Sequence, residues 1–402
     1  MTPESLRQTL AKTALAAILA LFLLPLLTWG LARHMRAGSD EGMRAGISAY
    51  VERARDLPAA EAQVIRAFLA AHRPSDTCDG VPSPVSTNEG GLCERYSPMW
   101  QFALAERVAL WTLIAGAALL ALMAALGALA FSSRRLQLRS FLAGWRVLVV
   151  ASAAEIALQG AFAVWLSFWI TAYFFEIYII KLILVVAFVV AAAIFGALVA
   201  MFRRANIDNE VQGERIERDA APALWTRLHE FADKLGTAPP DVVVAGVDAN
   251  FFVTEQSLRV AGEATKGRTL FVSLPLLRVL AQDEADAVLA HELGHFVGGD
   301  TAESAALGPK LVQFDSYLEQ MRTGGLTLVA FYVLHLYRLI FELALRKSSR
   351  EREFAADLVA AGLVSAPALA RSLVKVSAYA LYRGEVEGKL FEHDERHDGQ
   401  LG

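Results

Sequence analysis

The chain has 402 residues, of which 55% carry apolar side chains and only 20% are charged, and its mean hydropathy is +0.39. This apolar share excludes a disordered chain and exceeds what one globular core buries, so a membrane protein is expected. The net charge of −4 gives no basic field for nucleic acid, and two cysteines are too few for a disulfide scaffold.

Four apolar runs in the first half of the chain are long enough to cross a bilayer, which takes about 20 residues. The first run has basic residues ahead of it and could be a cleaved signal peptide, but it exceeds the usual apolar core of about 7–15 residues. A retained anchor within residues 1–32 and three further transmembrane helices within residues 108–202 are therefore expected. The four runs are residues 14–32, 108–131, 147–175 and 177–202.

The loop between the second and third runs predicts the orientation of the chain. It carries four arginines and no acidic residue, which is typical of a cytoplasmic loop. Residues 33–107 are then extracytoplasmic, and residues 203–402 are cytoplasmic. The four arginines are Arg134, Arg135, Arg139 and Arg146.

Both cysteines of the chain, Cys78 and Cys93, lie in the expected extracytoplasmic region, residues 33–107. An oxidising compartment favours a disulfide between them. Closing this loop would contribute about 3 kcal/mol on the chain-entropy model. Two unrelated free thiols are the alternative.

Residues 203–402 are more highly charged and show the pattern of an α+β domain. A helix is expected over 221–235, where a Gly-Thr-Ala-Pro-Pro segment ends it. Strands are expected over 241–247, 251–260 and 269–272. The fold class expected for the whole chain is thus α+β, with four N-terminal transmembrane helices ahead of a domain with a small sheet.

The sequence His291-Glu292-Leu293-Gly294-His295 is an H-E-x-x-H motif at the end of an acidic-started, alanine-rich helix. Residues i and i+4 share one helix face, so both imidazoles can reach one Zn²⁺ ion. Glu292 is then placed to act on water at the metal rather than to bind the metal. A stray H-E-x-x-H on a surface helix is the alternative.

A catalytic zinc needs a third protein ligand, and an acidic segment about 58 residues after His295 offers one. Glu353 is preferred because Asp357 lies one turn later on the same helix face and can accept a hydrogen bond from a ligand histidine. Glu351 has Ala355 at that place. An ordinary charged helix face is the alternative.

A fifth apolar stretch, residues 326–345, separates the two motifs. A single crossing there would place Glu353 on the opposite side of the bilayer from His291 and His295, and one ion cannot be shared across about 30 Å of hydrocarbon. We therefore expect that this stretch does not cross the membrane alone.

On these motifs the chain resembles the HtpX-like and CAAX-prenyl-protease-like integral membrane zinc peptidases of metallopeptidase family 48. The resemblance runs from about residue 221 to 370. It includes Asn250-Phe251-Phe252, where the family typically has Asn-Ala-Phe, and Glu353-Phe354-Ala355-Ala356-Asp357, which matches its Glu-x-x-Ala-Asp. Two features differ: no His-Pro-Pro segment is found near residue 402, and the family often has two N-terminal spans rather than four.

The resemblance implies a zincin-like (gluzincin) domain and one Zn²⁺ per chain. His291, His295 and Glu353 would be the ligands, Glu292 the catalytic acid/base and Asp357 a partner of a ligand histidine, with Asn250, Phe251 and Phe252 near a substrate strand. The activity implied is zinc endopeptidase cleavage of proteins or peptides, in particular misfolded membrane proteins, in contact with the lipid bilayer. The location implied is a bacterial inner membrane. A CAAX-type prenyl peptidase and a non-catalytic membrane sensor on the same scaffold are the alternatives.

Overall fold

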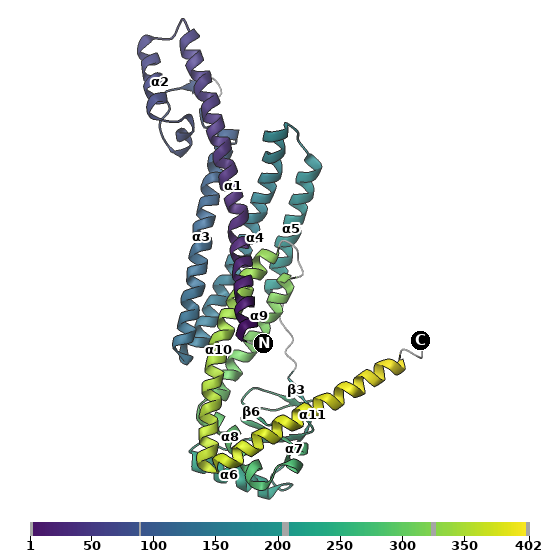
Figure 1. Cartoon of the computed structure of the whole chain (residues 1–402). Helices are drawn as coiled ribbons and strands as arrows, with labels where there is room; N and C mark the ends of the chain where they lie inside the picture. The colour runs from purple at the N-terminus through teal and green to yellow at the C-terminus, as the bar shows by residue number, and fades with distance from the viewer. Residues whose placement is uncertain (1–2, 88–89, 203–208, 323–326, 399–402) are drawn as a thin grey trace. The chain divides into compact units, whose positions relative to one another are not determined.

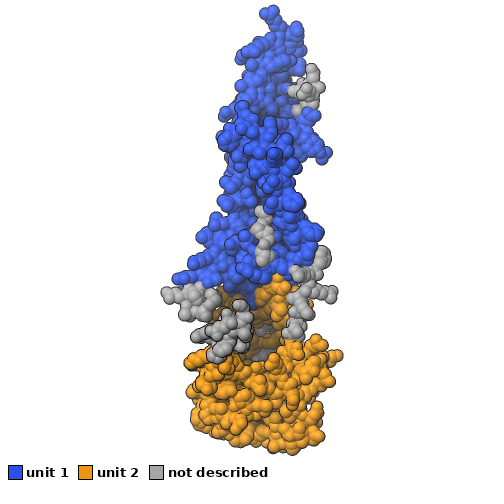
Figure 2. Space-filling model, turned by 90° about the vertical axis from the view of Figure 1, so that its right-hand side faces the viewer, with its two compact units in different colours: residues 1–129, 142–203, 317–340 blue, residues 130–141, 204–316, 341–402 orange. Residues whose placement is uncertain are grey.

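The computed structural model describes residues 3–87, 90–202, 209–322 and 327–398. The chain divides into two compact units, coloured separately in Figure 2. Unit 1 comprises residues 1–129, 142–203 and 317–340, and unit 2 comprises residues 130–141, 204–316 and 341–402. Several long helices therefore run from one unit into the other.

Five helices in the described part of the chain are long and apolar enough to cross a membrane (Figure 1). The first four contain the apolar runs expected from the sequence, although the fourth run begins three residues before its helix. How many of the five cross a bilayer and where the domains end remain predictions. The five are α1 (Pro3–Arg53), α3 (Pro98–Ser132), α4 (Arg134–Phe175), α5 (Ile180–Phe202) and α10 (Leu328–Leu363).

The expected extracytoplasmic region begins as a helix rather than a loop, because α1 continues to Arg53. It then forms α2 (Ala59–Ala71), the 3₁₀ helix η1 (Pro74–Asp79) and a short hairpin of β1 (Ser86–Thr87) and β2 (Gly90–Gly91). A disulfide joins Cys78 to Cys93, as expected, with a Cα–Cα distance of 5.2 Å. A small apolar core lies beneath it, formed by Val51, Ala62, Ile65, Phe68, Leu69 and Leu92.

Arg36 of α1 is at the centre of a polar network in this region. Its guanidinium donates to the carboxylates of Asp79 and Glu106 and to Ser75 Oγ, the last at 2.8 Å. Asp40, one helical turn later, accepts from both the backbone N–H and the hydroxyl of Ser75, each at 2.8 Å. The network ties α1 to η1 and α3.

Unit 2 contains a four-stranded sheet in the order β4-β5-β9-β6. The strands are β4 (Glu214–Arg215), β5 (Val242–Gly246), β6 (Phe252–Thr254) and β9 (Thr269–Ser273). β5 and β9 are parallel and fully paired, while β6 is antiparallel to β9 and forms one edge among the described strands. A second small sheet has the order β3 (Glu210–Val211), β7 (Arg259–Val260), β8 (Glu263–Ala264).

The strand expected over 251–260 is broken into β6 and β7. Thr254 Oγ1 accepts a hydrogen bond from the backbone N–H of Gln256 at 3.0 Å, which turns the chain out of the sheet. The helix expected over 221–235 is α6 (Pro222–Leu235). It ends at Gly236, whose φ of 64° is left-handed and suits glycine.

Helices α6, α7 (Leu274–Val279), α8 (Gln282–Val297) and α11 (Ala366–Asp398) complete the sheet domain. The main core of unit 2 lies between them and the strands, and it includes the fully buried Leu228, Leu270, Leu276 and Leu293. α8, which carries the H-E-x-x-H motif, contributes its apolar face to this core. The motif helix is thereby fixed on the sheet by packing.

Helices α9 (Asp300–Arg322) and α10 form an antiparallel pair where both lie in unit 2. Near their base, Nη1 of Arg352 in α10 donates to Oγ of Ser304 in α9 at 3.1 Å. The chain thus leaves unit 2 along α9 and returns to it along α10, which brings Glu353 back to the unit that holds His295. The expected fifth stretch starts at residue 326, outside the described residues, and its side of the membrane remains a prediction.

Candidate metal centre

The start of α8 is fixed by its own acidic residues. The Glu284 carboxylate accepts a hydrogen bond from the backbone N–H of Ala281 at 2.8 Å and so satisfies an N–H that the helix leaves open. From this start, His291 and His295 fall one turn apart on the same face. Their ring centroids are 5.1 Å apart and nearly perpendicular, at 88°.

Gly294, inside the motif, lets α10 come close to α8. A Cβ atom at this position would lie 3.3 Å from both Cα of Ala356 and Cγ1 of Val359. Such contacts are tighter than ordinary packing, so a larger residue would push α10 away. The missing side chain at 294 therefore allows Glu353 to reach the two histidines.

His291, His295 and Glu353 form a group whose ligand atoms all lie within 4.8 Å of one another. Nε2 of His291 is 3.5 Å from Oε2 of Glu353. Two atoms bound tetrahedrally to one Zn²⁺ at about 2.0–2.1 Å are themselves about 3.4 Å apart. Two imidazoles and one carboxylate are also the donor set of many catalytic zinc sites, so the residues present fit the ion.

Asp357 lies on the other side of the His291 ring. Its Oδ1 is 3.0 Å from His291 Nδ1, within hydrogen-bonding distance, although the ring N–H is not aligned on the oxygen. The two ring nitrogens of His291 thus face different carboxylates, Nε2 toward Glu353 and Nδ1 toward Asp357. Glu351 is exposed and is outside the metal-ligand group among the described residues.

Glu292 is half-buried in the same cleft. Loss of solvent around its carboxyl raises the pKa of Glu292 to about 8, and the nearby carboxylate of Glu353 adds to the shift. A hydrogen bond from the backbone N–H of Val253 acts in the opposite direction. That bond links the motif glutamate directly to the edge strand β6.

The cleft around these residues has a volume of about 400 Å³. Its polar lining consists of the two histidines, Glu292, Glu353 and Asn250. Its apolar lining comes from the edge strand and the residue before it, from α8 and from α11. Its side chains are Phe251, Phe252, Val253, Val288, Leu369, Leu373 and Val376.

The three residues expected near a substrate strand all line the cleft, but they are not equivalent. Asn250 precedes β6 and adds a polar side chain to the lining. Phe251 is only 4% exposed and belongs to the main core of unit 2. Phe252 stacks on Phe271 of the neighbouring strand at 4.9 Å, so the two phenylalanines chiefly hold β6 in place.

Sequence reasoning missed the contribution of α11. Leu369, Leu373 and Val376 follow the i, i+4, i+7 spacing of a helix face, and this signal was available in the sequence. α11 is held against α8 by Lys375 and Arg371, whose side chains lie 2.6 Å and 3.2 Å from the Glu284 carboxylate. These contacts lower the pKa of Glu284 to about 2, with Lys375 as the largest cause.

Comparison with known families agrees with the motifs. Residues 221–394 match the model described as peptidase family M48. This range contains the three residues of the metal-ligand group, the motif glutamate and most of α11. No solved structure is significantly similar to the chain.

Several relatives with the name protease HtpX or HtpX homolog match part of the chain. A protease HtpX homolog of Thermoplasma volcanium is 30% identical over 161 residues, which cover 38% of this chain and 50% of the relative. A homolog from a Nostoc species is 29% identical over 189 residues, 42% of this chain and 62% of the relative. Protease HtpX of Pasteurella multocida is 27% identical over 220 residues, 50% of this chain and 74% of the relative.

The chain therefore spans 50% of the length of the first of these relatives and 62% of the length of the second. The relatives, together with the apolar helices α1, α3, α4, α5 and α10, support a multi-pass membrane protein.

Proposed function

We propose that this chain, whose residues 221–394 match the model of peptidase family M48, is a membrane-embedded zinc endopeptidase. One observation carries the proposal: His291, His295 and Glu353 meet within 4.8 Å, in the cleft that also holds the Glu292 carboxyl. One Zn²⁺ per chain is the cofactor proposed, since these three side chains offer the donors it prefers.

Each of these residues has a separate role in the proposed reaction. His291, His295 and Glu353 would hold the ion, and Asp357 would fix the His291 ring through Nδ1. When bound, Zn²⁺ supplies a Lewis acid that polarises the scissile carbonyl and activates water. Glu292 takes a proton from the attacking water at its carboxylate and passes it to the nitrogen of the leaving amine. Its partly desolvated site strengthens it as a base.

The edge strand β6 supports an extended polypeptide as the substrate. Its outer edge has no strand partner among the described residues, and an added strand could use its backbone groups without regard to sequence. The apolar side chains Val288, Leu369 and Leu373 would receive an apolar substrate side chain next to the scissile bond. Broad cleavage of unfolded segments follows from this arrangement.

Misfolded membrane proteins are the substrates we propose, in a bacterial inner membrane with the peptidase domain in the cytoplasm. This part of the proposal rests on the resemblance of the motifs to the HtpX-like peptidases, on the candidate spans and on the basic segment at residues 132–146. The structure forms this segment as the start of α4 rather than as the loop expected from the sequence. The lipid bilayer is then the second partner of the chain.

Glu292→Gln in the full-length protein, purified in detergent, tests the assignment. Cleavage of casein and of an unfolded membrane protein should fall by about 10²- to 10⁴-fold, because the base is lost. Metal content, measured by elemental analysis, should stay at the parent level because all ligands remain. Glu351→Gln, at an exposed carboxylate two residues from Glu353, is the matched control and should keep its activity.

Three outcomes would contradict the proposal. Cleavage by the parent protein that persists with a metal chelator, or in Glu292→Gln, would remove the role assigned to the metal group. Cleavage confined to prenylated C-terminal peptides would replace the endopeptidase with a prenyl-protein peptidase. Metal binding without any cleavage would favour a sensor that uses the same scaffold.

A further inference from the structure

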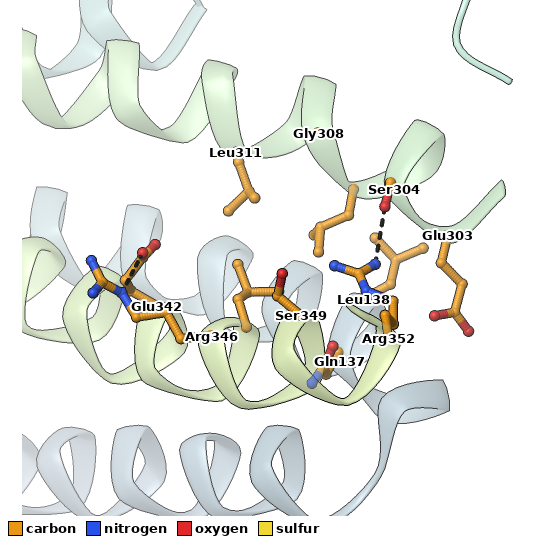
Figure 3. Close-up of a pocket in the computed structure, with 12 residues that line it drawn as sticks. Gln137, Leu138, Glu303, Ser304, Gly308, Leu311, Glu342, Arg346, Ser349 and Arg352 are labelled. Atoms are coloured by element: carbon orange, nitrogen blue, oxygen red, sulfur yellow. Dashed lines mark hydrogen bonds and ion pairs between the residues drawn. The ribbon is translucent and has the colours of Figure 1, made fainter. Parts of the chain in front are cut away.

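A second cavity in unit 2 is separate from the cleft at the metal-ligand group. It lies between the start of α4 and the facing parts of α9 and α10 (Figure 3), and its volume is about 430 Å³. We call it the α9–α10 cavity. Its apolar lining consists of Leu138, Leu307, Leu311 and Leu345, and Gly308 leaves room beside them. A cavity of this size and lining suits a small amphipathic ligand.

The charged lining of the α9–α10 cavity consists of two carboxylates, Glu303 and Glu342, and two arginines with different partners. Arg346 is neutralised by Glu342, whose carboxylate accepts from Nε at 3.0 Å. Arg352 donates to the neutral Ser304 hydroxyl at 3.1 Å, and Figure 3 marks no carboxylate contact to it among the residues drawn. Since a guanidinium has five N–H donors, Arg352 keeps donors for an anion in the cavity.

Further hydrogen-bonding groups lie along the same cavity. The Ser349 side chain lines it one turn before Arg352 on α10, and Gln137 of α4 lines it from below (Figure 3). Together with Ser304 they offer two hydroxyls and an amide around the guanidinium. Arginine with hydroxyl and amide groups is a set that binds phosphate oxygens.

The helices that form the cavity change there from apolar to polar. α3 ends at Ser132, and α4 begins at Arg134, three residues before Gln137 of the cavity. The apolar stretch of α10 ends at residue 345, and the next seven residues include Arg346, Lys347, Arg350 and Arg352. The cavity therefore lies where the apolar stretch of α10 is followed by basic residues, beside the basic first turns of α4, and this position suits the boundary between hydrocarbon and water.

We propose that the α9–α10 cavity binds an anionic phospholipid. Arg352 and Ser304 hold the phosphate, and the leucines receive the first part of an acyl chain. Cationic side chains at the end of an apolar helix attract anionic lipid headgroups in general. The leucines provide an apolar surface, which an acyl chain would contact and a free phosphate ion would not. The site is independent of the peptidase chemistry, since none of its residues belongs to the metal-ligand group.

Binding to the full-length protein, freed of lipid in detergent, tests this proposal. Native mass spectrometry would follow phosphatidylglycerol, phosphatidylcholine and inorganic phosphate as separate probes. Phosphatidylglycerol should bind better than phosphatidylcholine, and Arg352→Gln should weaken it by about tenfold or more through the loss of a charge-assisted bond. Arg350→Gln, at an exposed residue of the same helix, is the matched control and should bind as the parent does.

Three further measurements keep the outcome decisive if Arg352→Gln fails to fold. Arg352→Lys keeps the charge and should bind more phosphatidylglycerol than Arg352→Gln. Leu345→Ser should weaken the lipid and leave inorganic phosphate unaffected. A photoactivatable phosphatidylglycerol should crosslink within residues 303–311 or 342–352.

Several results would overturn the proposal. These are equal binding of the two lipids, an unchanged affinity in both Arg352 variants, or crosslinks outside these ranges. Inorganic phosphate that binds as tightly as phosphatidylglycerol would reduce the site to an anion site without a lipid.

Discussion

The helices α5 and α8 differ in what surrounds their apolar side chains, which are exposed on α5 and buried on α8. α5, in unit 1, exposes Phe188 and Phe195 at 74% and 69% of their surfaces. α8, in unit 2, buries ten of its sixteen residues against the sheet and α11. Water would penalise the surface of α5 heavily, whereas hydrocarbon would not. The comparison teaches that a bilayer-length apolar helix whose side chains stay exposed suits hydrocarbon as its solvent.

The buried polar side chains of the two units also differ in their partners. In unit 1, Gln159 of α4 is buried and donates to the carbonyl of Ala20 in α1 at 2.6 Å and to Glu155 at 3.3 Å. Inter-helix hydrogen bonds of this kind hold helices together where the hydrophobic effect is absent. In unit 2, buried acids such as Glu284 and Asp286 face basic side chains at the domain surface. The two units therefore use polar groups for different packing problems.

The largest expected effect tests the comparison itself. Phe188→Cys and Leu358→Cys replace side chains that are almost equally exposed, at 74% and 75%. In vesicles opened to expose both faces, a water-soluble maleimide should label position 358 and leave position 188 unlabelled until detergent is added. A thiolate does not form in hydrocarbon, and the reagent does not enter it. Equal labelling of the two positions would break the comparison.

The native cysteines give no background in this experiment, because they are joined to each other. The labelling pattern can therefore be assigned to the introduced thiol alone.

The next effect concerns the metal-ligand group of unit 2. Glu353→Ala should lose most of its bound zinc after dialysis against a weak chelator, since one of three protein ligands is removed. Elemental analysis of the dialysed protein measures the loss. Glu351→Ala is the matched control and should keep its zinc. If Glu351→Ala empties the site and Glu353→Ala does not, the ligand assignment is wrong.

A smaller effect is expected in the region of α2 and η1. Cys78→Ser together with Cys93→Ser should destabilise this region by about 3 kcal/mol, because an open loop of this length regains chain entropy. Limited proteolysis of residues 54–97 should become faster, while the zinc content of unit 2 stays the same. Faster cleavage in both units would mean that the disulfide supports more than its own region.

The smallest effect is a pH dependence at the junction of α8 and α11. The pKa of Glu284 is lowered to about 2 in the folded protein, from about 4.5 in the unfolded chain. The unfolded state thus binds more protons than the folded state between these two pH values. The stabilisation by Lys375 and Arg371 is therefore complete above about pH 4.5 and is lost as the pH falls toward 2.

Thermal unfolding of the full-length protein between pH 6 and pH 3 measures this dependence. A chelator removes the contribution of the metal ligands. Glu284→Gln should unfold at a lower temperature at pH 6 and should show a weaker pH dependence than the parent. The same slope in both proteins would exclude Glu284 as the titrating group.

Much of the helical pattern could be predicted because it depends on short-range order. Run length predicted the apolar helices, and the Gly-Thr-Ala-Pro-Pro segment predicted the end of α6, where Gly236 takes a left-handed conformation. The break between β6 and β7 was not predicted, because the turn at Thr254 depends on one side-chain hydrogen bond. The continuation of α1 to Arg53 was also missed, since its later turns are polar and lack a bilayer-length apolar run.

The sequence by itself determined which residues can act together on one helix. The spacing of His291 and His295, and of Glu353 and Asp357, is set by the 3.6-residue period, which needs no tertiary contact. Only the tertiary structure decided that these two helix faces meet. That meeting depends on the return of the chain along α9 and α10 and on the close approach of the two helices at Gly294. Packing between distant segments is governed by the shape of both surfaces and not by the helical period of either segment.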